Sequence, residues 1–142
     1  MRFKNNVNQN VVGLAFIRKL NPVTYSWDIQ KLDSFLGNDK LISEDPTLQA
    51  ARNKQEQITY GGFLAQEVEQ AAKDANYNFS GVVIPKNDKS LYSIRYAEFV
   101  VPLVKAAQEL DNQNDILIEL IEKQNSTIEM LLKKMETIEN SK

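Results

Sequence analysis

The sequence predicts an α+β fold in which a small sheet with packed helices precedes one long C-terminal helix. Three observations lead to this prediction. Short β-rich runs alternate with helical patterns over residues 1–102, where Gly, Pro and Asn separate them. Residues 103–142 contain no Gly, Pro or aromatic residue. Apolar residues recur there in alternating steps of four and three, which is typical of a parallel coiled coil. We therefore expect a globular domain over residues 1–102 and a coiled-coil stalk over residues 103–142.

The first expected elements are a helix and a strand. Apolar residues follow a helical period over residues 8–20, and Asn21-Pro22 ends the pattern because a residue before proline avoids the α region. Residues 23–27 alternate and are rich in β-formers, which predicts a strand. Asp28 is placed to cap a short helix that Gly37 ends.

The middle of the domain is less regular. Residues 38–57 are polar, with a possible helix over 46–56 that Asp45-Pro46 would start. Further elements are expected in chain order: a strand over 58–64 that Gly61-Gly62 interrupts, a helix over 65–75, and paired strands over 82–84 and 91–94.

The last helix carries the strongest pattern, an unbroken heptad seam that spans about 50 Å. It begins near Tyr96, and Pro102 is tolerable only near its start. Polar residues within the seam are expected to set its register at some cost in stability. The seam consists of Leu103, Ala107, Leu110, Asn114, Leu117, Ile121, Gln124, Ile128, Leu131, Met135 and Ile138.

The heptad pattern does not fix the number of helices in this coiled coil. Ile118 and Leu132 at e positions widen the apolar stripe, which favours more than two helices, but the pattern alone does not decide between a dimer and a trimer. The alternative is one long amphipathic helix folded against its own domain. We favour association between identical chains, because the seam exceeds what a domain of roughly 100 residues can cover.

The composition and the net charge argue against several classes of function. The chain has 142 residues, 42% hydrophobic and 25% charged, so it can build one core. A net charge of −2 provides no basic excess, and we expect neither nucleic acid nor membrane as a partner. The absence of Cys and His excludes thiol catalysis, the usual zinc sites and histidine bases, and we expect no metal and no cofactor.

The common catalytic and nucleotide-binding motifs are missing from the sequence. Glu67 and Glu69 diverge on a helix, so we interpret them as solvated rather than as the paired carboxylates of a hydrolase. Arg95 is interpreted as an ion-pair residue rather than an anion ligand. Gly61-Gly62 is interpreted as close packing or a bulge rather than an anion cradle.

Aromatic residues raise one more alternative. Trp27, Tyr25 and Tyr92 could form a receptor-binding tip for sugars, but core packing is the favoured interpretation.

Three stretches resemble the C-terminal intramolecular chaperone domain of phage endosialidases, tail spikes and tail fibres, a self-cleaving module that also occurs in the myelin regulatory factor. The first is RFKNNV at 2–7 with LNPVTYSW at 20–27. The second is GFLAQEVE at 62–69, and the third is IRYAEFVVPLVKA at 94–106, which runs straight into the heptads. Each motif is weak alone, but together they keep the family's order.

The resemblance implies autoproteolysis by a serine peptidase that acts once, on its own chain. The family's motif is Ser-Asp, three variable residues and Lys, with the cut before the Ser. Lys4 matches the lysine, the general base, and residues 1–3 fill the variable positions. The nucleophilic Ser would lie just upstream of Met1, so we expect the chain as given to be inactive. A lysine base must be neutral, which normally requires burial.

The resemblance also implies a role. The chain would be an intramolecular chaperone that forms a homotrimer, sets the register of an upstream tail-fibre or tail-spike-like polypeptide, and is released by cleavage. We expect it in the precursor of a virion tail fibre or spike, or of a bacterial surface or secreted protein, with assembly in the cytoplasm. The alternative is a structural trimerisation and attachment module that never cleaves.

Overall fold

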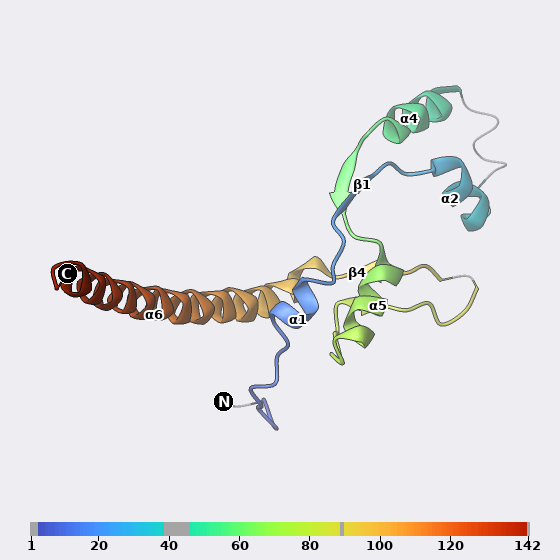
Figure 1. Ribbon diagram of the computed structural model, residues 1–142. Helices are drawn as coiled ribbons and strands as arrows, with labels where there is room; N and C mark the ends of the chain where they lie inside the picture. The colour runs from blue at the N-terminus through green and yellow to red at the C-terminus, as the bar shows by residue number, and fades with distance from the viewer. Residues whose placement is uncertain (1–2, 39–45, 89, 142) are drawn as a thin grey trace.

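The computed structural model describes residues 3–38, 46–88 and 90–141 (Figure 1). A head, defined as the described residues 11–99, sits at one end of a single long helix, α6. The elements are α1 (Leu14–Ile17), β1 (Val23–Tyr25), α2 (Ile29–Leu36), α4 (Pro46–Glu56), β2 (Tyr60–Gly62), α5 (Ala65–Asp74), β3 (Val82–Val83), β4 (Ser93–Ile94), the 3₁₀ helix η1 (Tyr96–Phe99) and α6 (Val100–Glu139). The α+β fold with a long C-terminal helix is thus confirmed.

The core of the head joins three distant parts of the chain. Phe16 of α1 is fully buried and packs with Val68 of α5 and Phe99 of η1. The Phe79 ring lies 4.9 Å from that of Phe16 and 4.7 Å from that of Phe99, measured between centroids. Such ring pairs stabilise a core beyond their buried area. This cluster fixes the start of α6 to the head.

The first helix is shorter than predicted: residues 8–20 were expected to be helical, and only Leu14–Ile17 is. The chain bends at Gly13, where α6 comes so close that a Cβ would lie 2.8 Å from the Ala106 backbone nitrogen. The N–H of Leu14 donates to Glu109 Oε2 at 2.8 Å. A carboxylate from α6 therefore caps α1, and the tertiary contact overrides the helical period of residues 8–13.

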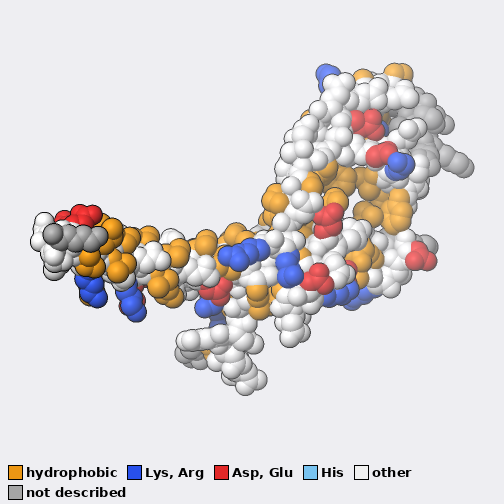
Figure 2. Space-filling view, viewed as in Figure 1, with side chains coloured by type: hydrophobic (Ala, Val, Ile, Leu, Met, Phe, Trp, Pro, Cys, Tyr) orange, Lys and Arg blue, Asp and Glu red, His pale blue; other side chains and the backbone are white. Residues whose placement is uncertain are grey.

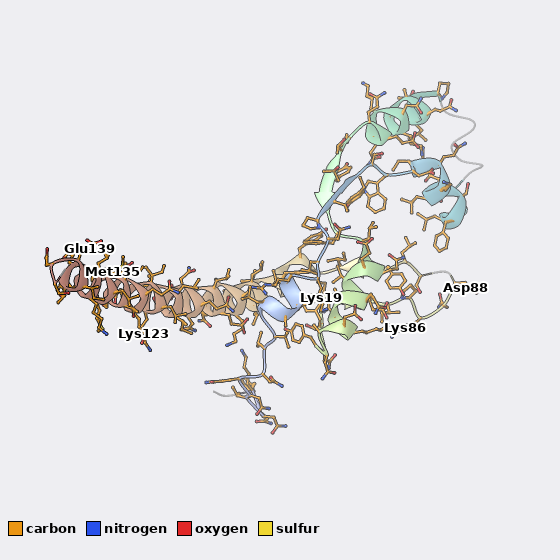
Figure 3. All side chains as sticks on the ribbon, viewed as in Figure 1. Lys19, Lys86, Asp88, Lys123, Met135 and Glu139 are labelled. Carbon is orange, nitrogen blue, oxygen red and sulfur yellow. The ribbon has the colours of Figure 1, made fainter. Side chains whose placement is uncertain are left out.

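The last helix, α6, runs unbroken for 40 residues, or about 60 Å. Pro102 is buried at its third position, where the missing N–H costs no helical hydrogen bond, as predicted. Residues 111–141 are all exposed, and α6 points away from the head (Figures 1 to 3). The alternative of a long helix folded against its own domain is therefore wrong for the described chain.

Two short strands form the base of an arm, defined as the described residues 23–62, that projects from the head (Figure 1). β1 pairs antiparallel with β2, so that Val23 faces Gly62 and Tyr25 faces Tyr60. The glycine pair was expected to interrupt this strand, but both glycines belong to it. A Cβ at Gly62 would collide with the Tyr96 hydroxyl, which confirms the close-packing interpretation there.

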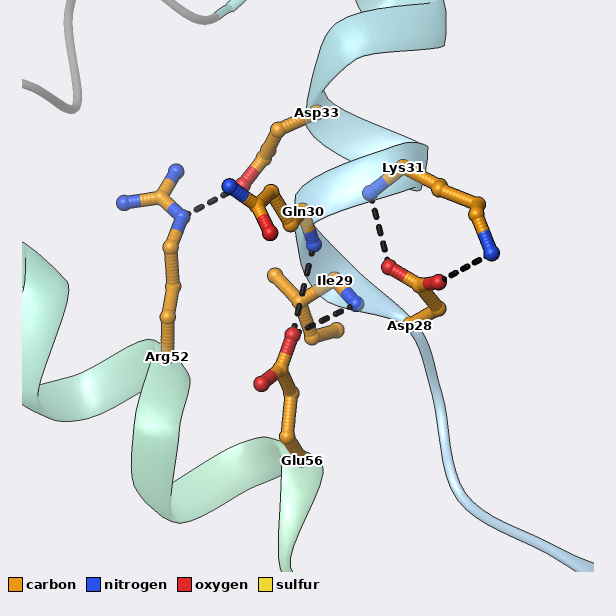
Figure 4. Close-up of polar contacts among 7 residues, drawn as sticks. All are labelled: Asp28, Ile29, Gln30, Lys31, Asp33, Arg52 and Glu56. Atoms are coloured by element: carbon orange, nitrogen blue, oxygen red, sulfur yellow. Dashed lines mark hydrogen bonds and ion pairs between the residues drawn. The ribbon is translucent and has the colours of Figure 1, made fainter.

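The tip of the arm is a pair of helices held by polar contacts (Figure 4). Asp28 accepts the Lys31 N–H at 2.9 Å and Gly37 ends α2 with φ 73°, as predicted. From α4, Arg52 pairs with the buried Asp33 at 2.5 Å.

A side chain of α4 also caps the N-terminal end of α2. Glu56 of α4 accepts the N–H of Ile29 at 3.1 Å, and so covers a free donor at the start of α2. The helix predicted over 46–56 is confirmed, whereas the cap predicted at Asp45 lies outside the described residues.

The rest of the head follows the prediction closely. α5 buries Val68, Ala71 and Ala72, and β3 pairs antiparallel with β4 in strands of two residues each. These strands are shorter than expected because the connections beyond them leave the ladder, while the Arg95 N–H continues it by donating to the Gly81 carbonyl at 2.8 Å.

The close approach at Gly13 allows a test. We expect Gly13→Ala to lower the free energy of unfolding by about 1–3 kcal/mol, because the added methyl meets the α6 backbone. Urea unfolding followed by Trp27 fluorescence measures the change. Gly61→Ala is the matched control, since nothing lies within 4 Å of its added Cβ. Equal stability of the two variants would contradict the proposed tight contact between α1 and α6.

Candidate functional site

The two sides of α6 have different surroundings. Pro102 and Ala106 are buried against the head, and Lys105 and Glu109 are half-buried there. In the heptad Pro102 and Glu109 occupy c and Lys105 occupies f, which face away from a and d, whereas Ala106 occupies g at the flank of the seam. The head therefore packs on the outer side of α6 and reaches the flank of the seam at Ala106, while the a and d side chains stay exposed along the whole helix.

Every predicted seam residue is exposed in the single chain. The large apolar members between Leu103 and Ile138 are 46–61% exposed. Val104, Ile118 and Leu132 at e positions extend this surface and are just as open. A contiguous apolar stripe of this length marks a protein-interaction site, because water contact with so much apolar surface is unfavourable.

Lys4 lies in an extended segment whose side chains are exposed from residue 3 to residue 10. The segment turns at Asn6, with φ 53°, and Asn8 donates its amide to the Asn6 carbonyl at 3.0 Å. Among the described residues no acidic group pairs with Lys4. Arg2 and Met1 of the predicted motif lie outside the described residues.

A cleft of about 400 Å³ separates this segment from the first turns of α6. Val104 lines the cleft and also flanks the seam at an e position. The N-terminal segment runs from this cleft into α1, beside the start of α6 (Figure 1). The full lining is Asn8, Gln9, Val11, Val101, Val104, Lys105 and Gln108.

Glu67 and Glu69 do not form a carboxylate pair, because each has its own partner. Asn21 donates to Glu67 Oε2 at 3.2 Å. Glu69 pairs with Lys73 at 2.5 Å and accepts the Tyr92 hydroxyl at 3.1 Å. The hydrogen bond from Lys73, followed by that from Tyr92, holds the pKa of Glu69 below its ordinary value. The two carboxylates are therefore not paired as in a hydrolase site, but only Glu67 is solvated as predicted, because the Glu69 side chain is just 19% exposed.

Arg95 does not form the ion pair that the sequence suggested. Its Nη2 donates to the Ser80 carbonyl at 2.8 Å, and no carboxylate among the described residues lies within salt-bridge distance. The guanidinium therefore fastens the chain before β3 to the end of β4.

The aromatic residues of the arm line a second cleft of about 530 Å³ between the arm and the rest of the head. Trp27 is 45% exposed and lies with Tyr25 and Tyr92 on this cleft, outside the buried core. The expectation of core packing is therefore wrong for all three: Trp27 is exposed, and the half-buried Tyr25 and Tyr92 lie outside the core. None of the lining residues is charged, and Figure 2 shows hydrophobic side chains in the hollow beneath the arm.

Other classes of site were sought within residues 3–38, 46–88 and 90–141. No group of three or more acidic side chains that could hold a metal ion occurs in these ranges. No helix in the same ranges is long and apolar enough to cross a membrane.

Comparison with known proteins yields one match. A family model described as chaperone of endosialidase matches residues 1–77, which is more than half of the chain. The match includes the Lys4 segment, α1, the arm and α5, and it ends before β3, η1 and α6. No curated protein and no solved structure matches the chain.

The partners of Glu69 predict a pH dependence. Its lowered pKa contributes stability above the ordinary value of 4.5, and this contribution is lost as pH falls through the lower, folded-state pKa. We therefore expect Glu69→Gln to flatten the fall of Tm below pH 4.5 in circular dichroism melts. Glu67→Gln is the control, because Asn21 is an uncharged partner. A Glu69→Gln profile that falls as steeply as the original would refute this.

Proposed function

Since the chain belongs to the family of chaperones of endosialidase, we propose that it joins three copies of itself through α6 and thereby guides the folding of an upstream client. The family description supports a chaperone with a tail-protein client. The single observation that carries the trimer proposal is the open seam. The head leaves every a and d side chain of α6 exposed, so these side chains are available to other copies of the helix.

Trimerisation at one end of a fibre has a physical benefit for the client. Fibrous β-rich trimers depend on contacts between chains and between distant residues, so they fold slowly and aggregate easily. Joining three chains at their ends raises the local concentration of the segments that must meet. The polar seam residues Asn114 and Gln124 favour one alignment of the helices, and that alignment extends to whatever precedes the heads.

We also propose that Lys4 is the general base of a self-cleavage step when Ser-Asp precedes residues 1–3. The neutral amine would take the serine proton, and the Oγ would attack the preceding carbonyl to form an ester and a free α-amino group. Water would then hydrolyse the ester and restore the serine hydroxyl. Cleavage would leave the client without its nucleating module, so that its stability becomes kinetic.

The position of the Lys4 segment supports a link between assembly and cleavage. The segment borders the cleft that Val104 shares with the edge of the seam. A neighbouring copy on the seam would cover this region and remove water from it, which is the change that a lysine base needs. The exposure of Lys4 in the single chain favours the second candidate, a trimerisation and attachment module that never cleaves.

The family resemblance also supports a place of action. We propose that the chain acts in the cytoplasm on the precursor of a virion tail fibre or spike, or of a bacterial surface or secreted protein.

The trimer proposal predicts a mass. We expect sedimentation equilibrium of the full chain at micromolar concentration to report three subunits. Ile121→Asp should weaken association more than about 1,000-fold, because each of three buried isoleucines contributes at least ~1.5 kcal/mol. Ser126→Asp, on the outer f position of the same helix, is the control and should leave the mass unchanged. A single-subunit mass for the unaltered chain would reject the proposal.

The cleavage proposal is tested in a chain extended by Ser-Asp and a short client segment before Met1. We expect mass spectrometry to detect the cut before the Ser, and Lys4→Ala and Lys4→Arg to abolish it, because arginine cannot lose its proton. Lys19→Ala, another exposed lysine, should cleave normally. Equal cleavage in the Lys4 variants would exclude Lys4 as the base. An uncut extended chain would favour the non-cleaving module.

A further inference from the structure

We propose that the layer of Gln124 side chains in the trimer binds one small monovalent anion, such as chloride or bromide, on the coiled-coil axis. This inference rests on the proposed trimer. It concerns a ligand site that is complete only when three copies contribute the same side chain.

The position of Gln124 on α6 creates the need for such a ligand. Gln124 occupies a d position between Ile121 and Ile128, which lie about 4.5 and 6 Å away along the helix axis. In the trimer these isoleucine layers would seal the glutamine layer from water above and below. The side-chain amide is exposed and has no hydrogen-bond partner among the described residues of the single chain, so burial in the proposed trimer would exchange its water contacts for partners from the assembly.

Counting donors and acceptors defines the ligand chemistry. Each amide carries two N–H donors and one carbonyl oxygen. A symmetric ring in which each carbonyl accepts from the next copy uses one N–H per chain and leaves the other N–H without a partner. A buried donor without a partner is costly. A spherical anion on the axis accepts equally from all three copies, and it takes stronger hydrogen bonds than a neutral acceptor does.

The neighbouring charges select Gln124 over the other polar layer. Asn114 is flanked by Asp111 and Asp115, with no basic residue between positions 110 and 118. These carboxylates would repel an anion.

Around Gln124 the charges balance, although Lys123 at c faces away from the coiled-coil axis. Glu122 and Lys123 are the only charged residues between positions 120 and 128. Lys123 lines the same shallow hollow on α6 as Gln124, together with Thr127 and Ile128. Figure 3 shows Lys123 projecting from the side of the helix. The two polar layers therefore differ in role: Asn114 sets register alone, whereas Gln124 also holds an anion.

The test measures how bromide stabilises the full chain. Thermal or urea unfolding of the trimer is followed by circular dichroism at fixed ionic strength, with sodium bromide replacing sodium fluoride. One bound anion per trimer makes the unfolding equilibrium constant fall about tenfold for each tenfold rise in bromide above its dissociation constant. We expect this slope in the original chain and in Asn114→Ile, and its loss in Gln124→Ile, where isoleucine at d still favours more than two strands.

Each outcome separates the anion site from the trimer. Equal bromide slopes in the original chain and Gln124→Ile, at trimer mass, would overturn the anion site and leave the proposed function intact. A single-subunit mass for the original chain would overturn the proposed function itself. Chloride nuclear magnetic resonance on the original trimer gives a second readout that needs no variant: we expect line broadening that bromide reverses, and an unbroadened line would refute the site.

Discussion

The exposed apolar seam of α6 is the constraint from which the rest of the molecule follows. A helix of 40 residues carries apolar side chains on the face that its own head does not touch, and all of them meet water in the single chain. Burial of such a stripe is the dominant favourable term in helix association, and only another chain can supply it here. The head packs on α6 through Pro102, Ala106 and Glu109 and leaves the a and d side chains exposed.

The junction between head and helix connects this interface to the N-terminal segment. Gly13 permits α1 to approach α6, and the Glu109 carboxylate caps α1 across a separation of 95 residues. Phe16 and Phe99 complete the joint inside the core. These contacts hold α1 at a defined place relative to α6. In the proposed trimer, this connection between α1 and α6 would link the register of the coiled coil to the heads.

The arm is held together by polar contacts, unlike the seam, which is apolar. Polar contacts, namely the Arg52–Asp33 pair and the Glu56 cap, hold α2 against α4, while aromatic side chains line the neutral cleft below them. The family match covers the arm but ends before α6. The chaperone assignment therefore rests on the head, and the trimer proposal rests on the helix pattern and its exposure.

Local patterns in the sequence determined the helix caps at Asp28 and Gly37, the buried face of α5 and the whole of the heptad seam, because each depends on residues only a few positions apart. Lys4 could be singled out only by family resemblance, since a lone lysine in an extended segment carries no local signal. Features that depend on the tertiary structure could not be predicted from local patterns. These are the short first helix that begins after Gly13, the inclusion of Gly61 and Gly62 in β2, and the position of Trp27 on a cleft rather than in the core. The side of α6 on which the head packs is a further feature of this kind. These features depend on contacts between residues far apart in the chain, and the free energy of such contacts exceeds the weak preferences of a short segment.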